Sequence, residues 1–156
     1  MKVAKDIILT FLIIPGLFTL LNVLTALKPV SGIQESKNFT LLPQEGFLRG
    51  NLKIDDDNGI TNWRSNKNIV HWKINCDRSG TYEINLIHKV TKSTPGINLN
   101  ISGQTFHKAV EKNSSETKIG KIDLKPGTYS VALYSPDLQK TARLPTIYSI
   151  IFTQIN

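Results

Sequence analysis

The sequence predicts an all-β sandwich behind one N-terminal hydrophobic helix. Runs of alternating apolar and polar residues recur along the chain after residue 38, and Gly, Pro, Asn and Asp clusters separate them. Alternation with a period of two is what a strand with one buried face requires. We find no amphipathic helix after residue 33. About eight to ten short strands at such spacing favour one sandwich or jelly-roll domain.

The N-terminal helix is predicted from an uncharged apolar stretch at residues 7–27, which Lys2 and Lys5 precede. Two interpretations stay open. A secretory signal would use the small residues near Ser31 for cleavage, whereas a membrane anchor needs only about 20 apolar residues. Both predict a secreted, periplasmic or cell-surface domain, with a membrane contact only through residues 7–27 if they stay attached. We therefore assign residues 1–32 to a signal peptide or anchor, 33–38 to a linker and 39–156 to the sandwich.

The domain begins with short extended segments at residues 39–42, 47–50 and 52–54. An acidic turn follows, from Asp55 through Asn58 to Gly59. Carboxylates and an Asn carbonyl are the hard oxygen ligands that calcium prefers. The spacing does not match an EF-hand loop, and no Glu closes it. We therefore favour a solvated Asx-rich turn over a calcium site.

The stretch from residue 60 to residue 90 contains the strongest strand pattern. Apolar residues alternate with polar ones from Val70 to Ile74 and again from Tyr82 to Val90. A polar turn at residues 76–80 joins the two runs and ends in Gly. The pattern predicts a central antiparallel hairpin. The lone Cys76 falls in this turn and cannot form an internal disulfide.

The remainder of the chain repeats this pattern. Ser102-Gly103 predicts a tight turn between two small strands, and Pro126-Gly127 predicts a second one. Beyond Ser135 comes a long polar loop with two prolines. The predicted strands of this half are residues 98–101, 104–110, 119–124, 128–134 and 146–154.

The order of these pieces resembles a known family. The motifs are FLRG at residues 47–50, Ile60-x-x-Trp63, Val70-x-Trp72, GTYEI from Gly80, NLNISGQTF from Asn98 and PGTY from Pro126. Together they are similar to the β-jelly-roll modules related to family-six carbohydrate-binding modules, as appended to secreted sulfatases and fucosidase-like glycosidases. The resemblance covers residues 39–154. It implies a galactose-binding-like sandwich with a non-catalytic, glycan-binding role.

The resemblance also bears on calcium. Family members that hold a structural calcium use an early acidic residue and a late Asp in the closing strand. Glu45 could be the first of these, but residues 144–156 contain no acid. We therefore expect no cofactor, because the closing strand does not support the calcium site.

Other functions find little support in the sequence. It contains no H-x-x-x-H or H-E-x-x-H zinc spacing, no G-x-S-x-G elbow and no P-loop, so we expect no enzyme. The first 32 residues carry a net charge of +2, which leaves +5 of the total +7 for the rest. That excess forms no Lys or Arg cluster of the kind a nucleic-acid binder uses. We expect no nucleic-acid partner.

A glycan site would combine aromatic stacking with side-chain amides that fix hydroxyl groups. We predict Trp63, His88, Tyr134 and Asn98 as candidates, because they lie near strand ends or loops where a rim site can form. Trp63 could instead belong to the core. The alternative function is an exported protein–protein interaction module, in which a face of the sandwich binds another exported protein and no sugar is involved.

Overall fold

The computed structural model describes residues 38–92, 95–136, 138 and 143–155. All the described strands belong to one compact unit, which spans residues 36–156. The predicted hydrophobic helix at residues 7–27 lies outside the described residues. Within the described part of the chain, no helix has the length and hydropathy to cross a bilayer.

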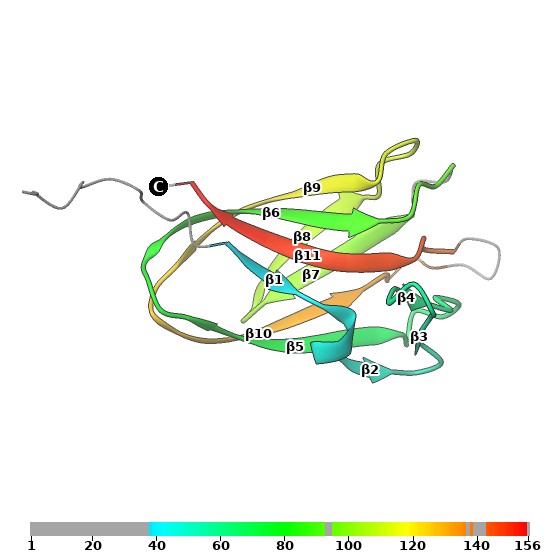
Figure 1. Cartoon of the computed structure of the whole chain (residues 1–156), viewed down its shortest axis with the longest axis horizontal. Coiled ribbons are helices and arrows are strands. Elements are labelled where there is room, and N and C mark those ends of the chain that lie inside the picture. Colours follow the sequence, from blue (N-terminus) through cyan, green and yellow to red (C-terminus); the bar gives the residue numbers. More distant parts are fainter. Residues whose placement is uncertain (1–37, 93–94, 137, 139–142, 156) are drawn as a thin grey trace, which may run out of the picture. The chain divides into compact units, whose positions relative to one another are not determined.

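The described domain consists of two antiparallel sheets, which confirms the predicted all-β jelly-roll sandwich (Figure 1). Sheet A has the strand order β3-β4-β11-β6-β9, with β1 pairing to β11, and sheet B has the order β2-β5-β10-β7-β8. A single 3-10 turn, η1 (Pro43–Glu45), connects β1 to β2. The strands of sheet A are β1 (Phe39–Leu41), β3 (Lys53–Ile54), β4 (Ile60–Thr61), β6 (Gly80–His88), β9 (Glu116–Leu124) and β11 (Ile147–Gln154). Those of sheet B are β2 (Phe47–Arg49), β5 (Ile69–Cys76), β7 (Gly96–Ile101), β8 (Gln104–Ala109) and β10 (Gly127–Tyr134).

The core lies between the two sheets and is built from the alternate residues that the sequence pattern selects. In β6, Tyr82, Ile84 and Leu86 are buried, while the residues between them are partly exposed. Val70 and Trp72 of β5 face them from sheet B and are buried as well. The period-two alternation therefore predicted these core side chains correctly, but it was wrong for Val90, which lies beyond the end of β6 and is exposed.

The predicted central hairpin is wrong. β5 pairs with β2 and β10 in sheet B, whereas β6 pairs with β11 and β9 in sheet A. The turn after Cys76 therefore crosses from one sheet to the other, and Figure 1 shows this crossing at the left end of the sandwich. Alternation reports which side chains are buried but not which strand is the partner, so two consecutive strands with matching patterns can face each other across the core. Cys76 itself ends β5 as a buried residue.

The predicted hairpin around Ser102-Gly103 is confirmed as β7 and β8. Both turn residues have positive φ, 45° at Ser102 and 102° at Gly103. Positive φ at both central positions matches the right-handed twist of the flanking strands. The two-residue turn fixes the register of β7 against β8.

The acidic turn between β3 and β4 satisfies its own backbone. Asp55 Oδ1 accepts a hydrogen bond from Gly59 N at 2.8 Å, and Asn58 adopts a φ of 60°. This bond spans four residues and closes the turn between the two strands. Glu45 also caps its own turn, because Leu42 N donates to Glu45 Oε2 at 3.3 Å.

Candidate functional site

The four sequence-predicted site residues fall into two groups. Tyr134 and Asn98 are direct cross-strand partners of β10 and β7, so their side chains share one face of sheet B. Trp63 and His88 are buried in the core, with exposed fractions of 2% and 1%. Tyr134 is half-buried on that face and can be reached by a ligand, whereas Asn98 is itself buried, with an exposed fraction of 6%.

Both ring nitrogens of His88 form hydrogen bonds inside the sandwich. Its Nδ1 donates to Lys89 O at 3.0 Å, which leaves Nε2 to accept from Thr117 Oγ1 at 2.9 Å. Thr117 Oγ1 in turn accepts from Glu111 N at 2.8 Å. Every polar atom of the imidazole is thus used internally, and His88 acts as a polar link between β6 and β9.

Tyr134 and Asn98 belong to a row of side chains that crosses all five strands of sheet B. In order across the sheet, the row runs Arg49, Ile69, Tyr134, Asn98 and His107. Four inter-strand steps of about 4.8 Å make the row about 19 Å wide. We call the outward surface that carries this row the sheet-B face.

His107 is a residue of the site that the sequence analysis missed. Its Nδ1 donates to Asn98 Oδ1 at 2.6 Å, which leaves Nε2 as an acceptor on an exposed side chain. The sequence could have predicted this neighbour of Asn98. Counting outward from a two-residue turn at Ser102-Gly103 places Asn98 opposite His107.

A hollow of about 260 Å³ lies at the end of this row. Its lining includes Asn98, His107, Gly96 and Pro136. The buried Ser135 donates its hydroxyl to Gly96 O at 2.6 Å and so ties the end of β10 to the start of β7. Tyr134 stands beside the hollow as the partner of Asn98. The arrangement joins an aromatic ring, an amide and an imidazole at the rim of a shallow depression.

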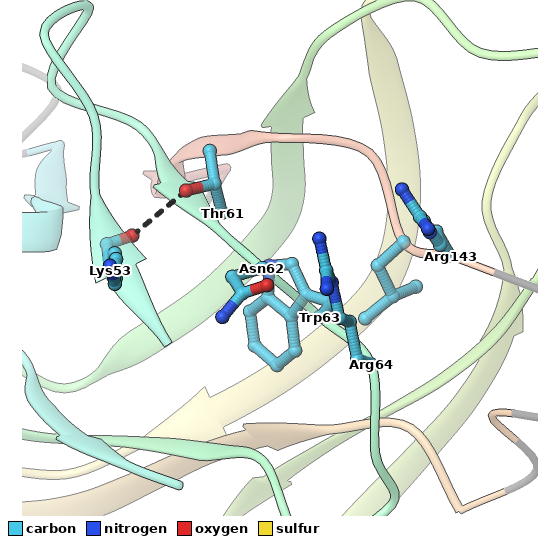
Figure 2. A pocket seen from close by; sticks show the side chains of 7 residues that line it. Lys53, Thr61, Asn62, Trp63, Arg64 and Arg143 are labelled. Carbon is cyan, nitrogen blue, oxygen red and sulfur yellow. Dashed lines mark hydrogen bonds between the residues drawn. The ribbon is translucent and has the colours of Figure 1, made fainter. Parts of the chain in front are cut away.

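A second cavity, the end pocket, has a volume of about 520 Å³. Its lining includes residues of β3 and β4, and Figure 1 shows these strands at the end of the sandwich opposite the β5–β6 turn. Figure 2 shows Asn62 and Trp63 in its middle, with Lys53 on one side and Arg64 and Arg143 on the other. Its lining is Lys53, Thr61, Asn62, Trp63, Arg64, Arg143 and Leu144.

The floor of the end pocket is fixed by internal hydrogen bonds. Trp63 Nε1 donates to Ile60 O at 3.0 Å, so the indole is anchored inward. Asn62 has a φ of 66°. Its carbonyl accepts from Asn68 Nδ2 at 3.1 Å, and its own Nδ2 donates to Asn51 O. Trp63 is thus a buried support of this pocket and offers no open ring face for stacking.

Two stretches that are distant in sequence form the end pocket, and no motif predicted their meeting. Lys53 and Arg64 belong to the β3–β4 hairpin and the residues after it, where Lys53 pairs with Thr61. Arg143 precedes β11, and neither spacing nor composition links it to this hairpin. Across the part of the chain that the structure describes, no three His, Cys, Asp or Glu residues gather as metal ligands.

The sandwich is similar to solved carbohydrate-binding modules. It matches the family 35 module from Clostridium thermocellum with a TM-score of 0.59 and 13% identity, over 74% of this chain and 98% of that one. It matches the CBM35 module of Cellvibrio japonicus Abf62 with a TM-score of 0.60 and 18% identity, over 74% and 92% of the two chains. The Podospora anserina GH26-CBM35 β-(1,4)-mannanase matches with a TM-score of 0.63 and 13% identity, over 78% of this chain but only 28% of the mannanase. At these identities the likeness shows the fold.

Comparison with curated proteins gives no match. A protein-family model, described as a domain of unknown function (DUF5077), matches residues 48–154 and so covers most of the sandwich. The chain therefore belongs to the DUF5077 family.

Proposed function

We propose that the sandwich is an exported, non-catalytic carbohydrate-binding module whose saccharide lies on the sheet-B face. The observation that carries the proposal is the juxtaposition of Tyr134, Asn98 and His107 beside a hollow at the end of that face. Saccharides present C–H faces that stack on aromatic rings and hydroxyl groups that pair with amides and imidazoles. The likeness of the fold to carbohydrate-binding modules supports the same function.

Each side chain has a distinct role in this proposal. The half-buried Tyr134 offers a ring for stacking and is flanked by Ile69 on one side and Asn98 on the other. His107 Nε2 accepts a hydrogen bond from a sugar hydroxyl, since Asn98 already occupies Nδ1. The hollow receives one sugar ring, and the remaining units follow the row across the strands toward Arg49. Residues 1–32 would direct or anchor the module outside the cell.

The test is a glycan-array screen of the full chain, with Tyr134→Ala and His107→Ala as site variants. Loss of one stacking contact worth about 1.5 kcal/mol lowers affinity about tenfold. Tyr148→Ala serves as the matched control, because Tyr148 is a half-exposed tyrosine on β11 of the other sheet. We expect the two site variants to lose binding and the control to keep it, with thermal unfolding confirming that all three are folded.

A protein-interaction role has one observation in its favour. Phe47 at the edge strand β2 is 68% exposed, and Leu42 nearby in the chain is 44% exposed. An exposed aromatic at a sheet edge suits contact with another protein. Absence of binding across a broad array would contradict the glycan proposal. A pull-down that Phe47→Ser abolishes would then support the interaction module.

A further inference from the structure

We propose that the end pocket binds an oxyanion group, a carboxylate or a sulfate, carried by an acidic saccharide. This inference rests on the proposed function, because it identifies the charge of the saccharide that the module would hold. The first observation is the lining itself. Lys53, Arg64 and Arg143 are exposed cations around one cavity of about 520 Å³, and none of the lining residues in the described part of the chain is acidic.

The three cations have no described acidic partner. The one ion pair that the structure places among the described residues joins Lys118 to Glu83, on strands β9 and β6. Asp55, Asp56 and Asp57 follow Lys53 in the β3–β4 turn. The Asp55 carboxylate accepts the Gly59 N–H, and none of the three carboxylates lines the pocket. Three like charges around one cavity repel one another, so a bound anion would lower the energy of the pocket.

The pocket is preorganised for such a group. The bonds from Trp63 to Ile60 and from Asn68 to Asn62 fix the floor, so ordering it on binding costs little. Figure 2 shows Arg64 and Arg143 extending in the same direction on one side of the pocket. A guanidinium presents a planar fork of donors that matches carboxylate and sulfate oxygens, and Lys53 adds a point charge opposite.

The size and the place of the pocket favour a saccharide over a free ion. A volume of about 520 Å³ falls within the roughly 300–1,000 Å³ of ligand pockets, so the pocket has room for a sugar ring beside the oxyanion. The pocket also lies near the same end of the sandwich as the hollow beside Asn98. Ile69, which begins β5 shortly after Arg64, is the cross-strand partner of Tyr134. One oligosaccharide could therefore contact both.

The experiment compares an oligogalacturonate with its fully methyl-esterified counterpart, because the two differ in charge at the carboxyl group. Titrations use the full chain and the variant Arg64→Gln/Arg143→Gln. The matched control is Arg78→Gln/Lys125→Gln, which removes two exposed charges at the far end of the sandwich, about 25 Å away along the eight residues of β5. Inorganic sulfate is titrated separately as the free oxyanion.

We expect the native chain to bind the acidic oligosaccharide at least about tenfold more tightly than the ester. The Arg64→Gln/Arg143→Gln variant should lose this preference, while the control variant keeps it. Equal affinity for acid and ester in the native chain, with binding still dependent on Tyr134, would overturn this inference and leave the proposed function standing. Pocket-dependent binding of sulfate with no binding of either saccharide would overturn the saccharide assignment of this pocket. The proposed function would be overturned as well only if the glycan array also shows no binding.

Discussion

Individual polar side chains inside the sandwich link the strands by hydrogen bonds. Thr117 is 1% exposed, accepts from Glu111 N and donates to His88 Nε2. A group that bonds on both sides cannot be replaced by an apolar isostere without leaving two buried partners unpaired. This is the physical reason why His88, although it lies at the end of a strand, has no hydrogen-bonding atom left for a ligand.

Thr117→Val therefore tests the buried network. We expect it to lower the free energy of unfolding by about 1–3 kcal/mol, since it leaves the His88 ring nitrogen and the Glu111 N–H without their partner. Urea unfolding measures the change. Thr153→Val, at a half-exposed threonine of β11, is the control and should change stability little. If Thr117→Val is as stable as the native chain, the hydrogen bonds of Thr117 do not contribute to the free energy of unfolding.

The ionisation of Tyr82 predicts an alkaline effect. Burial, followed by its contacts with Cys76, raises the pKa of Tyr82 from 10.0 to about 12. The folded state thus favours the neutral phenol. The stability this contributes is present below pH 10 and is lost as pH rises toward 12.

Melting temperatures between neutral pH and pH 12 test this effect in the native chain and in Tyr82→Phe. The variant starts less stable, because it lacks the hydroxyl that donates to Arg78 O at 3.4 Å. Above pH 10 the native chain should lose stability faster than the variant, so the gap between them narrows. Parallel pH profiles would refute the assignment.

Between elements, the close approach of β8 and β9 depends on a glycine. A Cβ added at Gly120 would lie 2.9 Å from Phe106 Cδ1. Gly120 pairs with Ile84 in β6, next to a register shift in the β6–β9 ladder. The ring of Phe106 can therefore pack against the backbone of sheet A, which helps to close this side of the sandwich.

Gly120→Ala should destabilise the fold by about 1–3 kcal/mol, because the added methyl group overpacks against the Phe106 ring. The double variant Gly120→Ala/Phe106→Leu removes the ring edge and should recover part of that loss. A double-mutant cycle by chemical denaturation measures the coupling. Strictly additive effects would contradict the contact.

At the scale of the whole domain, one core joins both sheets. Trp72 of β5 is buried in that core, and Trp63 supports the end pocket. A single shared core makes cooperative unfolding the expected behaviour of a small domain.

We therefore expect tryptophan fluorescence and far-UV circular dichroism to report the same urea midpoint. Trp72→Phe leaves Trp63 as the reporter of the end pocket, and its transition should coincide with that of the backbone. An earlier fluorescence transition in this variant would show that the end pocket opens before the sandwich unfolds.

The sequence by itself determined the class of the fold, because a period of two marks every strand with one buried face. It also determined the β7–β8 register, because a two-residue turn at Ser102-Gly103 pairs Ile101 with Gln104. The positive φ of both turn residues in the structure agrees with this turn. The resemblance to carbohydrate-binding modules, stated from the sequence, agrees with the class of fold observed. The relationship to family-six carbohydrate-binding modules stays a prediction.

Only the tertiary structure decided the strand partners and the site. β5 and β6 have matching patterns, yet they lie in opposite sheets, because alternation encodes burial and not partnership. Arg143 meets Lys53 and Arg64 around one pocket, although it lies far from both along the chain. Spacing predicts contacts only within an element or across a short turn, whereas a site made from distant loops depends on how the sheets stack.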